Sequence, residues 1–157
     1  MRAIKFRAKP DMGYFLTSDD VEVKDGFVYG VPDVRMLDVP GAEVWRKGHR
    51  DVDMPSIVAC TRDGWPRSVA VDENTIGQFT SLRDKNGNDI YEGDILKCGD
   101  EKTLLEVRFV RGVFAFLWNG DLDDEFPCNA PTQEWAEIVG NIHDNPKLIR
   151  RRNSPTL

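Results

Sequence analysis

The stretch "LLEVRFVRGVFAFLW", residues 104–118, alternates apolar and polar or small residues on both sides of Arg111-Gly112. This period of two is typical of β-strands, and a two-residue turn at Arg111-Gly112 would join them as an antiparallel hairpin. One face then pairs Phe109 with Phe114, Val107 with Phe116 and Leu105 with Trp118. The other, mixed face pairs Val110 with Val113, Arg108 with Ala115 and Glu106 with Leu117. An apolar face of this kind needs a second layer or barrel closure, so we expect its large rings to fill the interior.

Upstream lies "KNGNDIYEGDILK", residues 85–97. Asn86-Gly87 predicts a two-residue hairpin turn, because both residues tolerate a positive φ. Glu92 and Asp94 project to one face of an extended strand, and Gly93 between them is typical of a bulge or a barrel corner. The two acids are either a catalytic pair that shares a proton or a metal, or scaffolding that accepts backbone amides or faces water. We favour scaffolding, since exposed acidic pairs are far commoner than catalytic ones.

The rest of the chain also indicates short strands. "IKFRA" at residues 4–8 alternates, Asp25-Gly26 is a hairpin signal, and Asp63-Gly64 separates two further extended segments. Helical periodicity is scarce, which predicts a mainly β fold that ends in a short helical turn near Pro146. We expect three parts: a β-rich, irregular N-terminal part (residues 1–74), a β-structured domain (75–149) and a basic frayed tail (150–157).

Composition narrows the class of protein. The formal charge of −6 over 157 residues removes any general attraction to nucleic acid or anionic lipid. Cys60, Cys98 and Cys128 lie far apart, and an odd count without a C-x-x-C motif gives neither a zinc site nor a disulfide framework, which favours reduced thiols in a cytosol. The sequence shows no secretory signal and no apolar stretch of membrane-spanning length. We therefore expect a cytoplasmic protein without a membrane partner.

Two clusters resemble metal sites loosely. "HRDVD" places His49, Asp51 and Asp53 at alternating positions, and His143 supplies the other imidazole in the chain. The acids Asp121, Asp123, Asp124 and Glu125 fail the EF-hand pattern at several positions. Solvated loops explain both clusters better. The prediction is therefore no metal, no cofactor and no catalytic residue.

The tail is the candidate for nucleic-acid contact. Arg150, Arg151 and Arg152, with Lys147 nearby, could hold phosphates, and Trp118 or Tyr91 could stack on bases. Arginines on a frayed terminus more often serve solubility, and we assign the aromatic residues to packing first.

Three segments together resemble the YopX family of small phage and prophage proteins. They are "IKFRA" at residues 4–8, "GQFTSLRDKNGNDIYEGDILK" at 77–97 and "EIVGNIHDNPKLI" at 137–149. The resemblance implies an SH3-like β-barrel over residues 75–149, an origin in mobile elements and no established enzymatic activity. Residues 31–75 and 119–134 fall outside the pattern.

The leading functional hypothesis is a non-enzymatic interaction or assembly module that binds a protein partner or itself through loops or an open sheet edge. One alternative is a nucleic-acid-binding accessory protein that uses the tail. The other is a metal-dependent hydrolase that uses Glu92 and Asp94 or the His49 cluster.

Overall fold

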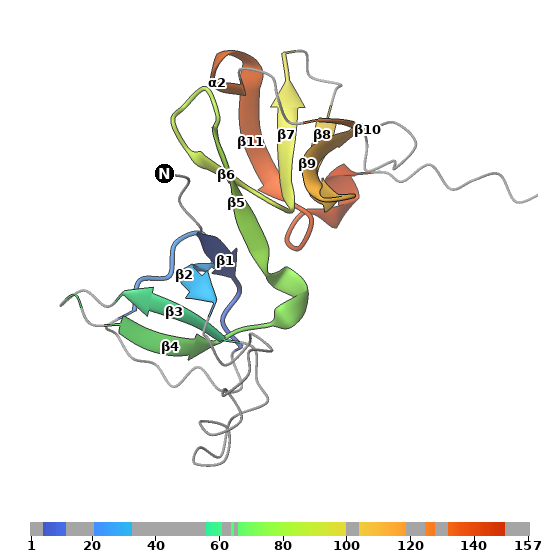
Figure 1. Cartoon of the computed structure of the whole chain (residues 1–157). Coiled ribbons are helices and arrows are strands. Elements are labelled where there is room, and N and C mark those ends of the chain that lie inside the picture. The colour runs from blue at the N-terminus through green and yellow to red at the C-terminus, as the bar shows by residue number, and fades with distance from the viewer. Residues whose placement is uncertain are drawn as a thin grey trace, which may run out of the picture. The chain divides into compact units, whose positions relative to one another are not determined.

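The structure is a computed structural model that describes residues 5–11, 21–32, 56–60, 64, 66–99, 104–118, 125–127 and 132–149. The chain divides into two compact units, one of residues 4–78 and the other of residues 1–3 and 79–157. Antiparallel strands in two sheets make up most of the regular structure, which confirms the mainly β expectation (Figure 1). The three-part division of the sequence stays a prediction.

The unit of residues 4–78 is built on short strands. They are β1 (Phe6–Ala8), β2 (Val28–Pro32), β3 (Ser56–Cys60), β4 (Pro66–Ala70) and the first residues of β5 (Gly77–Arg83), with the 3-10 turn η2 (Glu73–Thr75) before β5. Their order in the sheet is β4-β3-β2-β1-β5. Asp25 and Gly26 have φ of 53° and 79°, and Lys24 and Phe27 exchange two backbone bonds of 2.9 Å, so the predicted two-residue hairpin is confirmed. The buried core consists of Ala8, Val21, Val28, Ile57, Ala59, Val69 and Val71.

The unit of residues 79–157 contains a five-stranded antiparallel sheet in the order β10-β9-β8-β7-β11. Its strands are β7 (Asp94–Cys98), β8 (Leu104–Val110), β9 (Val113–Trp118), β10 (Glu125–Pro127) and β11 (Ala136–Asn141). The rest of β5 pairs with β6 (Asp89–Tyr91), and the short helices are α2 (Thr132–Trp135) and η4 (Pro146–Leu148). The expected terminal helical turn is thus confirmed as η4. In contrast, Glu125, which was expected in a solvated loop, is the first residue of β10, a strand of three residues that is too short to carry periodicity.

The β8–β9 hairpin has the register predicted from its sequence in all six pairs. Arg111 and Gly112 have φ of 49° and 86°, the combination that a two-residue turn of matching twist requires. Leu105, Val107 and Phe116 are completely or almost completely buried. They pack in one core with Ile90, Leu96 and Ala136, and the Phe116 ring meets Trp135 edge-on at 5.7 Å between centroids. The apolar face of the hairpin therefore organises this unit.

The expectation that all the large rings of this hairpin lie inside is wrong for two of them. Phe114 and Phe116 are buried, but Phe109 is 47% exposed and Trp118 is 44% exposed. These two residues belong to the outer two of the three pairs on this face, on either side of the buried Val107–Phe116 pair. A period of two identifies the face of a strand, but it does not say how far along the strand the covering layer extends.

Backbone groups on the outer edge of β11 are hydrogen-bonded to other segments of the same unit. Lys85 N–H donates to the Ala136 carbonyl at 2.9 Å, and Ile138 N–H donates to Asp84 Oδ2 at 3.3 Å. Farther along, Asn141 N–H donates to Asn145 Oδ1 at 3.3 Å. Within the described residues no ladder joins β10 to β11, so the SH3-like barrel stays a prediction.

Among the residues that the structure describes, no helix is both long and apolar enough to span a bilayer.

Candidate functional site

The Glu92–Asp94 turn between β6 and β7 is built around backbone amides. Asp94 is 1% exposed, and its Oδ2 accepts the Tyr91 N–H at 2.8 Å. Glu92 is half-buried and points elsewhere, since its Oε1 accepts the N–H of Phe109 on β8 at 3.3 Å. Each carboxylate therefore holds a different strand, as the scaffolding interpretation predicts.

Gly93 has a backbone conformation that favours glycine. Its φ is 86°, and its N–H and carbonyl bond Val107 and Ile142 at 2.8 and 2.9 Å. A Cβ on this residue would meet His143 Nε2 at 3.4 Å. Strand β8 and the segment after β11 thus meet at the predicted bend, and His143 lies against it.

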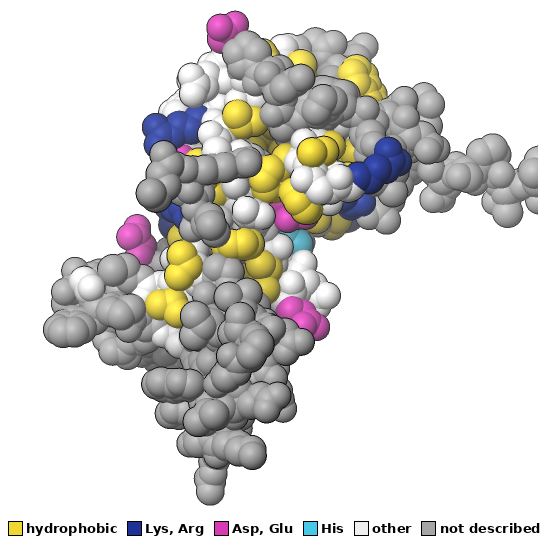
Figure 2. All heavy atoms as spheres, in the orientation of Figure 1, with side chains coloured by type: hydrophobic (Ala, Val, Ile, Leu, Met, Phe, Trp, Pro, Cys, Tyr) yellow, Lys and Arg dark blue, Asp and Glu magenta, His cyan; other side chains and the backbone are white. Residues whose placement is uncertain are grey.

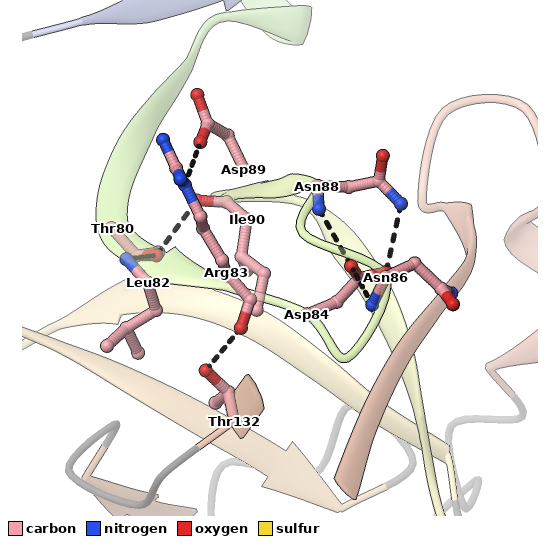
Figure 3. A network of polar contacts seen from close by, with 9 residues as sticks. All are labelled: Thr80, Leu82, Arg83, Asp84, Asn86, Asn88, Asp89, Ile90 and Thr132. Carbon is pink, nitrogen blue, oxygen red and sulfur yellow. Dashed lines mark hydrogen bonds and ion pairs between the residues drawn. The ribbon is translucent and has the colours of Figure 1, made fainter. Parts of the chain in front are cut away.

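Asp84 is the central acid of this region, and sequence reasoning missed it. Its side chain is 1% exposed, at the start of the loop between β5 and β6. Oδ1 accepts the N–H groups of Asn86 and Asn88 at 2.9 and 2.8 Å, and Oδ2 accepts the Asn88 side-chain amide at 3.2 Å. Figure 3 shows the carboxylate enclosed by this loop, between Asn86 and Asn88. The available signal was an Asp two residues before Asn-Gly, the spacing of an Asx turn.

The turn at Asn86-Gly87 is one residue longer than the predicted two-residue turn. Asp84 N–H bonds the Asn88 carbonyl at 2.9 Å and Gly87 N–H bonds the Asp84 carbonyl at 3.0 Å, which encloses a three-residue loop. Gly87 has a φ of 84°, whereas Asn86 is not among the described residues with positive φ. This combination is a type I turn followed by a left-handed glycine, not the predicted two-residue turn. The carboxylate capping the two Asn amides favours this longer form.

Opposing effects act on the acidity of Asp84. Burial raises the pKa of its carboxyl, but hydrogen bonds from Asn88, Ile138 and Asn86 together outweigh burial and hold the pKa below its ordinary value. On the neighbouring surface, a hydrogen bond from the Lys85 side chain lowers the pKa of Glu137. The Asp84 carboxylate is therefore an anionic cap on this loop, and it joins the β5–β6 hairpin to β11.

Strand β8 carries a further ion pair that sequence reasoning did not identify. Glu106 is 2% exposed although it faces Ile95 and Leu117 across the ladders, and its Oε1 lies 2.6 Å from Arg108 Nη2. The spacing of two residues on one strand was the signal, because it places both side chains on the same face.

The other candidates are partly outside the described residues. Outside them lie the His49 cluster, three of the four clustered acids and the arginines of the tail: His49, Asp51, Asp53, Asp121, Asp123, Asp124 and Arg150–Arg152. Whether His49 approaches His143 therefore also lies outside the described residues. Glu125 is described only as the first residue of β10. Tyr91 is 2% exposed, which leaves Trp118 as the accessible ring of the two proposed for stacking. Over the described ranges, no three His, Cys, Asp or Glu side chains are grouped as metal ligands would be.

Comparison with known proteins identifies a family. Among solved structures, the chain resembles "Crystal structure of protein EF1440 from Enterococcus faecalis" with 28% sequence identity and a TM-score of 0.37, over 54% of this chain and 69% of that chain. No curated protein matches the chain significantly. The family model described as "YopX protein" matches residues 40–150, well over half of the sequence. The chain therefore belongs to the YopX family.

Proposed function

We propose that this chain is a non-enzymatic interaction or assembly module of a phage or prophage that acts in the host cytoplasm and binds a protein partner or a second copy of itself. The observation that carries the proposal is the exposure of large apolar side chains on one hairpin. Phe109 is 47%, Val113 54% and Trp118 44% exposed on β8 and β9. On the face drawn in Figure 2, hydrophobic side chains also reach the surface beside Lys and Arg.

Rigid aromatic side chains make good binding anchors. The Phe109 ring packs edge-on against Phe114, with 5.1 Å between centroids, so part of its orientation is already fixed before a partner binds. Exposed aromatics that lose little entropy on binding dominate many protein interfaces. In addition, the acids of the Glu92–Asp94 turn and Asp84 hold backbone amides, which suits a scaffold.

We further propose that residues 75–149 form an SH3-like barrel. Supporting this are the antiparallel order β10-β9-β8-β7-β11, the left-handed Gly93 at a bend and the 3-10 turn η4 near the end. A small barrel would present the β8–β9 hairpin as a projecting element beside its loops.

The test removes the two exposed rings together, as Phe109→Ser with Trp118→Ser. Sedimentation velocity over a concentration series measures self-association. Affinity capture from host cells that carry the phage or prophage measures partner binding. Wild type should associate or capture a defined protein, and the double variant should lose at least about tenfold in affinity, as for loss of an interface anchor. Val23→Ser is the matched control, because Val23 is 42% exposed but lies outside this hairpin. A wild-type chain that stays monomeric and captures nothing, or a double variant that behaves like wild type, would contradict the proposal.

A further inference from the structure

The Asn86-Gly87 pair is chemically reactive, and the conformation of its loop opposes the reaction. Both residues are exposed, and no Cβ on Gly87 would have a neighbour within 4 Å. Among the described residues the Asn86 side chain has no hydrogen-bond partner, and in Figure 3 it extends away from the Asp84 carboxylate. An Asn followed by Gly is the dipeptide most open to intramolecular attack, because no side chain shields the following backbone nitrogen.

The loop geometry opposes that attack. Gly87 N–H is bonded to the Asp84 carbonyl at 3.0 Å, so the nitrogen would have to leave this bond before it could react. In a type I turn the ψ of Asn86 is near zero, and closing a five-membered ring needs a rotation of about 120°. That rotation would also move the Asn88 N–H, which lies on the other side of the rotated bond, relative to Asp84 Oδ1, which accepts it at 2.8 Å.

We infer that Asn86 is a latent deamidation site whose reaction is suppressed in the folded protein by the Asp84 cap. On opening of the loop, Gly87 N gives its proton to solvent and attacks Asn86 Cγ. The N–Cγ bond forms, the Cγ–Nδ2 bond breaks and ammonia leaves with a proton from solvent. Water then adds to one carbonyl carbon of the succinimide, the bond from that carbon to the Gly87 nitrogen breaks, and the nitrogen takes up the proton. Cleavage at Cγ gives aspartate at position 86, and cleavage at the backbone carbonyl carbon gives isoaspartate.

The isoaspartate product would not fit the loop. Isoaspartate inserts an extra methylene into a main chain of three loop residues whose ends are held by the Asp84–Asn88 bond of 2.9 Å. The longer main chain would displace the backbone amides that the buried Asp84 carboxylate accepts. The same carboxylate holds Ile138 N–H, so the damage would spread from the loop to β11.

The experiment compares the rate of deamidation at Asn86 in folded wild type, in the Asp84→Ala variant and in a synthetic peptide of residues 83–89. Mass spectrometry with fragmentation localises the change during incubation at neutral pH. We expect wild type to react at least about tenfold more slowly than the peptide, as for a site held by bonds to a charged acceptor. Asp84→Ala should approach the peptide rate, whereas Glu137→Gln should keep the wild-type rate, because Glu137 pairs with the Lys85 side chain instead of capping the loop.

Circular dichroism establishes that the variants are folded before their rates are compared. If Asp84→Ala does not fold, hydrogen exchange of the Gly87 amide in wild type replaces it, since exchange requires opening of the same bond. Its protection factor should match the slowing of deamidation to within about threefold, the spread expected for one shared opening. A wild-type rate equal to that of the peptide would overturn the inference. So would a folded Asp84→Ala variant with the wild-type rate, or a Gly87 amide that exchanges freely.

Discussion

Replacing Asp84 with Ala should destabilise the unit of residues 79–157 strongly. The change removes the acceptor of three backbone amides, those of Asn86, Asn88 and Ile138, together with the Asn88 side-chain bond. The two Asn residues are exposed, so their amides can turn to water and lose about 0.5–1 kcal/mol each, whereas the part-buried Ile138 amide loses about 1.5 kcal/mol. The expected decrease in the free energy of unfolding is therefore about 3 kcal/mol.

Urea denaturation followed by tryptophan fluorescence measures this decrease as a lower midpoint at an unchanged slope. Glu137→Ala is the control, because it removes a neighbouring acid that bonds only a surface lysine, and its midpoint should not move. If Asp84→Ala shifted the midpoint no more than the control does, the capping role of Asp84 would be refuted.

The stabilisation that Asp84 provides should also depend on pH and should decrease in acid. Because the pKa of Asp84 is lower in the folded protein than its ordinary value, the stabilisation is fully present above the unfolded pKa of about 4. It is lost as pH falls through the folded pKa. The difference between wild type and Asp84→Ala should thus be constant from about pH 6 to 8 and shrink below about pH 4. A difference that grew in acid would contradict the assignment.

Three further substitutions test the backbone of the fold. Gly30→Ala would place a Cβ well inside van der Waals contact with the carbonyl oxygen of Val58 on β3, so we expect a loss of about 3 kcal/mol or failure to fold, seen in a thermal melt. Ser81 has a φ of 71°, so Ser81→Val should lower the unfolding free energy by about 1–2 kcal/mol and Ser81→Gly should not; equal effects would contradict backbone strain there. Asp94→Ala removes the acceptor of Tyr91 N–H and should cost about 2 kcal/mol in urea, and an unchanged midpoint would argue against the scaffolding role.

The sequence predicts the β8–β9 hairpin well because two signals agree there. Alternation sets the faces and the Arg111-Gly112 turn sets the register, which together determine all six pairs. The depth of burial is not encoded in the same way. Phe109 and Phe116 share one face, yet one is 47% exposed and the other is fully buried, because what covers them comes from elsewhere in the chain.

The candidate site could be predicted only in part for a similar reason. The carboxylates of Glu92 and Asp94 were expected to hold amides, but their partners Phe109 and Tyr91 follow from tertiary geometry and the local turn. Asp84 was missed because its importance comes from Ile138, 54 residues later in the chain. A local pattern can show an Asx turn, but it cannot show which distant strand shares the carboxylate.

The occupied edge of β11 restricts how copies of this protein can join. A foreign strand that lengthened the sheet there would have to displace Asp84 from Ile138 and Asn145 from Asn141, and break the bond from Lys85 to Ala136. Main-chain pairing gives little affinity when the groups it needs are already bonded within the same molecule. Fibre-like growth by strand addition is therefore disfavoured on this side, and the self-association proposed above would have to use side-chain surfaces, which can saturate at a defined number of subunits.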